Sequence, residues 1–98
     1  MKRELVLAKL KDAEAELRAR GVVHAALFGS TARGEERFDS DIDIMVEIDR
    51  DKCQGVYAYV GLVRSIGDMF LERVDVSNRA AMKYHVRPSA ERDAIYAF

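Results

Sequence analysis

One nine-residue segment constrains the fold of this chain more than any other. Residues 41–49 read DIDIMVEID, and every second position is apolar and branched: Ile42, Ile44, Val46 and Ile48. Successive side chains of a β-strand point to opposite faces, so this period of two predicts a strand with one apolar and one acidic face. The apolar face has to be buried, and we therefore expect a sheet that is covered by helices on that side.

The residues before this strand predict a helix and a second strand. Apolar side chains recur at helical spacing through the first 20 residues, and Gly21 follows as a stop signal. Residues 22–28 then form a nearly continuous apolar run, which is typical of a buried strand. The chain is expected to turn sharply after this run, at Gly29-Ser30.

The residues after this strand predict two more helices and a third strand. Asp51 is interpreted as an N-cap, and the helix after it is expected to bury Val56, Val60, Val63, Ile66 and Phe70. Residues 73–76 are expected to form a strand. A helical turn near 80–84 and a last helix over 89–96, after Pro88, complete the order. The predicted fold class is α/β (α+β), a small mixed β-sheet flanked by about four helices, with room for a right-handed crossover between the second and third strands.

Size and composition limit the classes of protein. The 98 residues fit one domain, 1–98. Lys and Arg total 16 against 17 Asp and Glu, so direct nucleic-acid binding is not expected. No apolar run approaches the ~18–20 residues of a membrane span, and the start of the chain is too charged for a secretory signal. The single cysteine, Cys53, excludes an internal disulfide, and we expect a cytoplasmic protein.

Three aspartates are candidate metal ligands. Asp41 and Asp43 lie two positions apart on the predicted strand, which places them on one face, about 6.6–7 Å apart. Mg²⁺ prefers oxygen ligands and is commonly held by one or two carboxylates together with substrate phosphates. Asp75 stands between two valines on the third strand and joins the pair if the two strands are neighbours. An Asp-x-Asp pattern alone is also typical of a solvated strand face.

The Gly29-Ser30 turn is a candidate phosphate site. Glycine lets the backbone approach a phosphate closely, and a serine that caps a short helix over 31–33 offers a hydroxyl and free N–H groups. The same pair is also compatible with an ordinary turn and cap, so its meaning depends on the aspartates that follow.

Two other ligand motifs fail because residues that they require are absent. A phosphate-binding P-loop requires a lysine after Gly34, where this chain has Glu35. A calcium loop built on Asp39, Asp41 and Asp43 would need glycine at Ile44 and glutamate at Arg50.

Together these residues resemble a known family. Gly29-Ser30, ten intervening residues and Asp41-Ile42-Asp43 resemble the G-S-x10-D-x-D signature of the DNA polymerase beta-like nucleotidyltransferases. The longer string GSTARGEERFDSDIDIMVEID resembles the smallest branch, the MNT-domain proteins. The resemblance covers most of the chain, including the leading helix, the strand around Asp75 and the tail 92–98.

The resemblance implies a nucleotidyltransferase fold and a magnesium-dependent reaction. Such a protein transfers AMP from ATP to a hydroxyl and releases pyrophosphate. Asp41 and Asp43 would bind two Mg²⁺ ions, and Asp75 would bind the ion that activates the hydroxyl and would accept its proton. Gly29 and Ser30 would hold the distal phosphates, with Arg33 close by. Thr31 departs from the pattern, because many relatives carry arginine or another large residue there.

The resemblance also implies a partner. Small MNT proteins are often encoded beside a HEPN-domain ribonuclease toxin, and better understood ones resemble antitoxins that attach AMP to a tyrosine near the toxin's R-x4-H-x-Y motif. Two alternatives stay open: an antitoxin that neutralises its toxin by binding alone, and a transferase for small molecules. The sequence does not identify a base pocket. Tyr57 and Tyr59 are interpreted as packing residues, as are His24 and His85, and Arg33 as either a phosphate ligand or the partner of Asp39 or Glu36.

Overall fold

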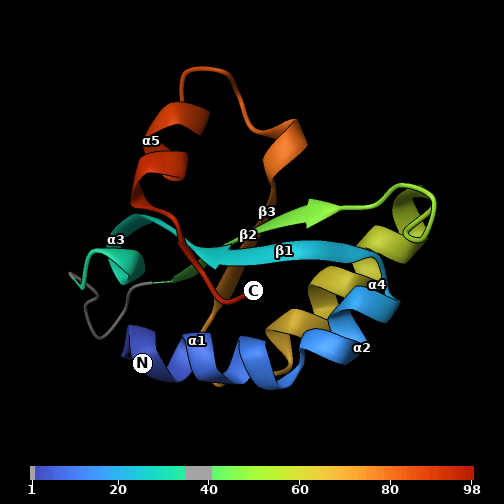
Figure 1. The fold of residues 1–98 in the computed structure, drawn as a ribbon, viewed down its shortest axis with the longest axis horizontal. Coiled ribbons are helices and arrows are strands. Elements are labelled where there is room, and N and C mark those ends of the chain that lie inside the picture. Colours follow the sequence, from blue (N-terminus) through green and yellow to red (C-terminus); the bar gives the residue numbers. More distant parts are fainter. Residues whose placement is uncertain (1, 35–40) are drawn as a thin grey trace.

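The computed structural model describes residues 2–34 and 41–98, and its centre is a four-stranded sheet of order β3-β2-β1-β4 (Figure 1). The central strand β2 is antiparallel to β1 and parallel to β3, and β4 is antiparallel to β1. The predicted mixed sheet is therefore confirmed. The strands are β1 (Val22–Leu27), β2 (Ile42–Ile48), β3 (Val74–Asn78) and β4 (Ile95–Tyr96).

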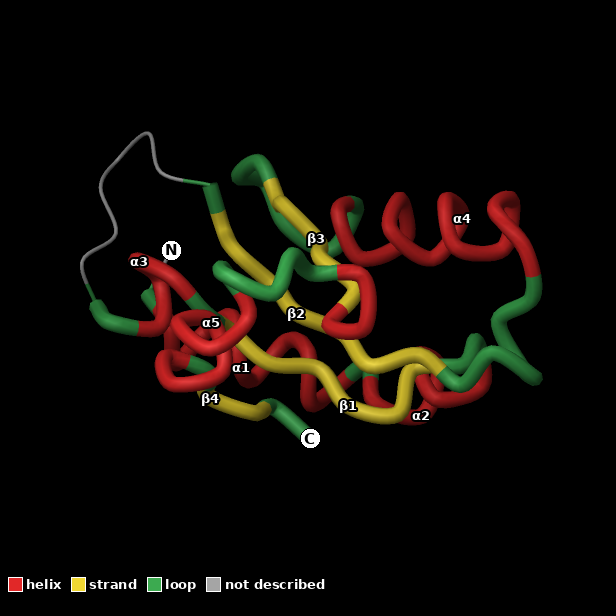
Figure 2. Tube along the Cα trace, turned by 90° about the horizontal axis from the view of Figure 1, so that it is seen from above, coloured by secondary structure: helices red, strands yellow, loops and turns green. Residues whose placement is uncertain are grey.

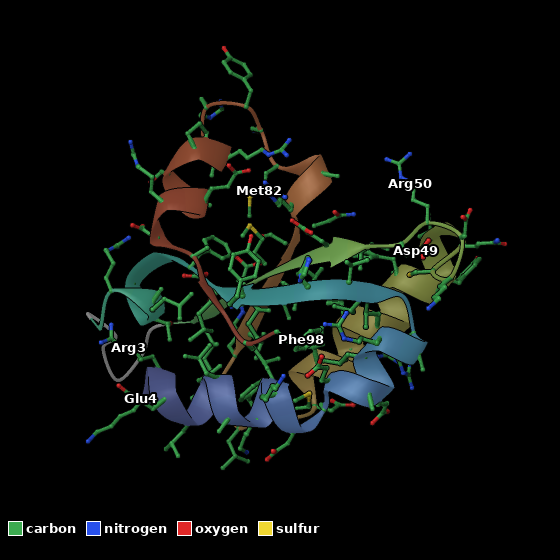
Figure 3. The ribbon with its side chains drawn as sticks, viewed as in Figure 1. Arg3, Glu4, Asp49, Arg50, Met82 and Phe98 are labelled. Atoms are coloured by element: carbon green, nitrogen blue, oxygen red, sulfur yellow. The ribbon has the colours of Figure 1, made fainter. Side chains whose placement is uncertain are left out.

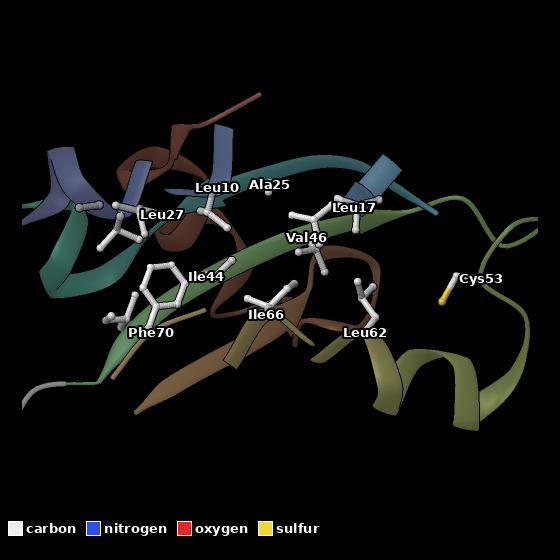
Figure 4. Packing of buried hydrophobic residues seen from close by; sticks show 14 residues of the cluster. Leu10, Leu17, Ala25, Leu27, Ile44, Val46, Cys53, Leu62, Ile66 and Phe70 are labelled. Atoms are coloured by element: carbon white, nitrogen blue, oxygen red, sulfur yellow. The ribbon is translucent and has the colours of Figure 1, made fainter. Parts of the chain in front are cut away.

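Three helices cover the apolar face of this sheet: α1 (Arg3–Asp12), α2 (Glu14–Ala19) and α4 (Gly55–Gly67). Figure 4 shows their buried side chains meeting those of the strands. The core includes Leu10 and Leu17 from the first two helices, Ile44 and Val46 from β2, and Leu62 and Ile66 from α4. The branched residues of segment 41–49 therefore pack against the helices, as their alternation in the sequence predicted.

The first 20 residues form two helices and not the single one expected. Ala13 leaves the helical conformation with ψ near 4°, and its N–H bonds to the carbonyls of both Lys9 and Leu10. The predicted apolar face survives this break, because Val6, Leu10 and Leu17 are all buried.

The prediction for α4 was wrong in two respects. The helix begins at Gly55, after Gln54, so Asp51 lies in the preceding turn and is not its N-cap. Of the residues expected on its apolar side, Ile66 and Phe70 are buried but Val56 and Val60 are exposed. Leu62, which was not among them, is buried. Both sides of this helix are apolar, so spacing alone could not identify the side that packs on the sheet.

The second face of the sheet is covered at one end only. The short helices α3 (Gly29–Ala32) and α5 (Arg87–Asp93) lie close together there, and the 3-10 helix η1 (Arg79–Ala81) follows β3 (Figure 2). The last helix was predicted at 89–96 but ends at Asp93, and residues 95–96 pair with β1 instead. Pro88 lies in the first turn of α5, where its missing N–H costs no hydrogen bond.

In the described ranges, 2–34 and 41–98, none of the helices combines the length and the apolar composition needed to cross a membrane.

Candidate functional site

Asp43 and Asp75 are direct neighbours on adjacent parallel strands. The strands β2 and β3 lie side by side (Figure 2), and their register pairs Asp43 with Asp75, flanked by the pairs Ile42–Val74 and Ile44–Val76. The flanking valines pack against the core, whereas Asp75 is exposed and Asp43 is partly buried. The prediction that the two strands are neighbours, with Asp75 turned away from the core, is confirmed. Both carboxylates therefore lie on the face opposite α1 and α4.

Asp41 lies at the entrance to β2, one residue before the strand begins. Its carboxylate is partly exposed, and Arg73 Nε lies 3.9 Å from its Oδ2. The Arg73 side chain is itself 86% exposed, so water screens this ion pair and leaves it weak. Among residues 2–34 and 41–98, Asp41 therefore has no strong ion pair.

Thr31 holds the start of β2 through a hydrogen bond. Its side chain is almost fully buried, and its hydroxyl donates to the carbonyl oxygen of Asp41 over 3.4 Å. The Phe28 N–H donates to the carbonyl of Asp43 over 3.1 Å, close to the same junction. Sequence reasoning treated Thr31 only as a departure from the family pattern. In the structure it links α3 to the start of β2. The sequence alone does not reveal this role, because the contact depends on the fold.

Position 29 requires a glycine because the Asp43 carboxylate lies against it. Its φ is +68°, and a Cβ built on it would lie only 2.6 Å from Asp43 Oδ2. Residues with a side chain rarely adopt this φ, and the space for a side chain is already taken by the carboxylate. The glycine predicted to let a phosphate approach also lets the Asp43 carboxylate lie against the turn.

The serine of this turn is placed differently from the prediction. Helix α3 spans Gly29–Ala32 with Phe28 at its N-cap position, so Ser30 lies inside the first turn and does not cap the helix. Its side chain is partly buried. Ser30 still adjoins Gly29, which touches Asp43, so the candidate phosphate residues and the carboxylates belong to one site.

Arg33 connects this site to α5. Its Nη1 lies 2.7 Å from Asp93 Oδ2, in an ion pair in which the aspartate side chain is 25% exposed. The acidic partners considered from the sequence, Glu36 and Asp39, lie outside the described residues. A small cavity of about 170 Å³ is lined by residues of α3 and α5, among them Gly29, Arg33 and Asp93.

Electrostatics set Asp43 apart from its neighbours. Burial raises the pKa of the Asp43 carboxyl above its ordinary value, and the negative charges of Asp75 and Asp41 raise it further, while Arg33 lowers it. Desolvation and like charges both disfavour the ionised form of a carboxyl group. The fold therefore places these three carboxylates near one another, and their repulsion lowers the stability of the folded state.

The residues present fit a divalent cation such as Mg²⁺. All three side chains are carboxylates, the hard oxygen ligands that this ion prefers, and a bound cation would relieve the repulsion that raises the Asp43 pKa. Within the described part of the chain, no three His, Cys, Asp or Glu side chains are already converged into a metal-binding cluster. The expected convergence of all three carboxylates is therefore not found among these residues, and the register of β2 and β3 places only Asp43 and Asp75 side by side.

The tyrosines considered as base-stacking candidates lie on α4, away from the face that carries Asp43. Tyr57 is 94% exposed, so its interpretation as a packing residue was wrong, whereas Tyr59 is partly buried and packs against the core. His24 is held in place by a hydrogen bond between its Nδ1 and the carbonyl of Phe98 and by an edge-to-face contact with Tyr96. Cys53 is a buried free thiol.

Comparisons with known proteins identify the family of this chain. The profile of the family described as "Nucleotidyltransferase domain" matches residues 7–97. A candidate protein adenylyltransferase of Methanocaldococcus jannaschii is 39% identical over 72 residues, which is 72% of either chain. The protein adenylyltransferase MntA of Thermococcus cleftensis is 32% identical over 82 residues, covering 83% of this chain and 81% of that one.

Solved structures share the fold. A structure described as a candidate minimal nucleotidyltransferase superposes with a TM-score of 0.80 at 27% identity, over 97% of this chain and 95% of that one. A toxin–antitoxin structure with AMP-PNP superposes with a TM-score of 0.70 over 90% of this chain and 72% of that one. The identity to the second is 19%, so it supports the fold alone.

Proposed function

Because the chain belongs to the nucleotidyltransferase domain family, we propose that it transfers AMP from ATP to a hydroxyl on a partner protein. The observation that carries this proposal is the register of β2 and β3, which pairs Asp43 with Asp75 beside the Gly29 turn. Two relatives named as adenylyltransferases of proteins support AMP as the group and a protein as the acceptor. The proposal takes residues 1–98 as one minimal domain.

In this reaction the acceptor oxygen forms a bond to the α-phosphorus of ATP, and the bond from that phosphorus to the oxygen bridging to the β-phosphate breaks. Pyrophosphate leaves, and the hydroxyl proton passes to a carboxylate, for which Asp75 is our candidate because it is exposed beside Asp43. Asp41, Asp43 and Asp75 would hold Mg²⁺, which supplies charge stabilisation to the attacking and leaving oxygens. The protein's own task is mainly to position the reactants.

The remaining residues would bind the triphosphate. Gly29 and Ser30 begin α3 beside the Asp43 carboxylate, so phosphates near this turn would lie next to the carboxylates. Arg33 adds a positive charge that already acts on Asp43. Its ion pair with Asp93 fixes the guanidinium at this end of the sheet, where it would lie close to the distal phosphates.

We propose further that the partner is a HEPN-domain toxin and that its modification on a tyrosine makes this chain an antitoxin. This assignment extends the resemblance to the MNT-domain proteins, and the Thermococcus relative, a protein adenylyltransferase named MntA, supports a protein as the acceptor.

The test is to incubate the purified chain with the HEPN-domain protein, Mg²⁺ and ATP labelled on either the α- or the γ-phosphate. We expect label from the α position only, together with a mass increase of one or more AMP units on a tyrosine. Label arriving only from the γ position would identify a kinase. A binding-only antitoxin would neutralise the toxin equally well as an Asp43→Asn variant, with no label transferred.

A further inference from the structure

A second surface lies at the other end of β2, away from Gly29 and Asp43. The β3 ladder ends with Asn78 opposite Val46, while β2 continues to Ile48. The space beyond β3 is a groove of about 720 Å³ between the end of β2 and the first turns of α4. We call it the α4 groove, and it is lined by Ile48, Arg50, Cys53, Gln54, Gly55, Val56, Tyr59, Asn78 and Ala81.

The outer side of α4 extends this groove with exposed apolar side chains. Val56, Tyr57 and Val60 are 73%, 94% and 50% exposed. Tyr57 and Val56 precede Val60 by three and four positions, and residues at these spacings are neighbours on a helical surface. Leu62 and Ile66 occupy the buried side of the helix. Contiguous apolar surface of this kind on a small domain marks a site of protein interaction.

The charge of the groove is one-sided. Among the residues that the structure describes, Arg50 is the single charged residue in its lining, and no carboxylate lines it. Figure 3 shows Arg50 extending away from the ribbon beyond the end of β2, and within residues 2–34 and 41–98 it makes no ion pair. Gln54 makes no side-chain capping bond at the start of the 13-residue helix α4, so the positive end of the helix dipole also faces this space.

From these observations we infer that the α4 groove binds a segment of the partner protein that presents apolar side chains flanked by a carboxylate. The apolar side chains would cover Val56 and Val60, and the carboxylate would lie beside Arg50 and the first turn of α4. The inference rests on the proposed function for the identity of that partner, the HEPN-domain protein.

The position of the groove suits an acceptor that must reach the carboxylates. Tyr59 lines the groove from α4, and α4 packs beside β3, the strand that carries Asp75. Asn78, the last residue of β3, lines the groove as well. A protein held in the groove would therefore lie along β3, the strand whose opposite end carries Asp75.

The test measures binding of the HEPN-domain protein to the full chain by titration calorimetry, for wild type, Val60→Asp and Arg50→Glu. Both side chains are exposed, so both variants should fold. We expect each to weaken binding tenfold or more, since anchors and charges that a partner desolvates dominate interface energies. Arg92→Glu, a charge reversal at an exposed arginine of α5 outside the groove, is the matched control and should stay within about twofold of wild type.

Transfer kinetics separate this inference from the proposed function. The groove variants should raise the KM for the HEPN-domain protein and retain kcat at saturation, because Asp43 and Asp75 are untouched. Wild-type affinity and KM in both groove variants would overturn the docking inference and leave the transferase proposal standing. Absence of α-label transfer by the wild type would overturn the transferase proposal. Self-association of the chain alone that Val60→Asp abolishes would assign the groove to a second copy and overturn the partner assignment.

Discussion

The two ends of β2 carry opposite kinds of surface. At its start, Asp43 lies between the Gly29 turn and Asp75, and carboxylates repel one another in a partly buried setting. At its end, Ile48 borders an apolar groove whose single lining charge is the cation Arg50. Neither feature stabilises the isolated domain, since clustered like charges and exposed apolar side chains are both unfavourable in water. Under the two proposals, the start of β2 binds a cation and phosphates, and its end binds the partner protein.

The largest effect should come from removing charge at the start of β2. We expect Asp43→Asn to lower AMP transfer by about 10³-fold or more, because stabilisation of transition-state charge through a bound metal is worth several kcal/mol. The measurement is the initial rate of α-label transfer, with circular dichroism to verify the fold. Asp12→Asn, at an exposed aspartate on α1, is the control and should keep the wild-type rate. A wild-type rate of AMP transfer by Asp43→Asn would show that the start of β2 is not the site of transfer.

The next effect separates the two sides of α4. Leu62 is buried in the core, so Leu62→Ala should lower the free energy of unfolding by about 2–5 kcal/mol. Val60 lies half exposed on the outer side, and Val60→Ala should change the free energy of unfolding by less than about 0.5 kcal/mol. Urea denaturation of both variants gives the comparison. Equal losses would mean that the outer side of α4 serves the fold and not a partner.

A smaller effect concerns the glycine at the turn. Gly29→Ala forces a left-handed backbone onto alanine, at a cost of about 1–2 kcal/mol, and drives a methyl group into the Asp43 carboxylate. Gly55 has a φ of +81° with nothing within 4 Å of a built Cβ, so Gly55→Ala carries the backbone cost without the clash. In thermal melts, we expect Mg²⁺ to raise the Tm of Gly55→Ala but not of Gly29→Ala. Equal Mg²⁺ responses would show that the contact with Asp43 does not shape the metal site.

The smallest effect is the pH dependence of stability. Because the pKa of Asp43 is raised in the folded state, the native protein binds the proton more tightly than the unfolded chain, and stability falls as pH rises through the folded pKa. Asp43→Asn should therefore stabilise the metal-free protein at neutral pH, by less than about 1 kcal/mol for a partly exposed group. The gain should vanish as pH falls below the ordinary aspartate range. Urea unfolding with EDTA between pH 3 and 7 measures it, and a loss of stability at pH 7 would contradict the stated repulsion.

Much of the fold followed from local pattern. The alternation of Ile42, Ile44 and Val46 gave the right strand and the right buried face, because a period of two leaves one arrangement that buries branched residues. The prediction of which α4 residues are buried was wrong for Val56 and Val60. These two residues are as apolar as Leu62, and only contact with the sheet distinguishes them. The helix expected over 89–96 failed because Ile95 and Tyr96 found a strand partner in β1, which no local signal predicts.

The sequence by itself determined which residue types could form the proposed site. Gly29, Ser30 and the aspartates at 41, 43 and 75 indicate oxygen ligands near a backbone turn, because side-chain chemistry and strand periodicity are local properties. Only the tertiary structure decided that Asp75 pairs with Asp43, that the Gly29 turn touches the same carboxylate and that Arg33 is bound by Asp93. These contacts join residues that are distant in the chain, and their geometry is fixed by strand pairing and core packing, which no local pattern contains.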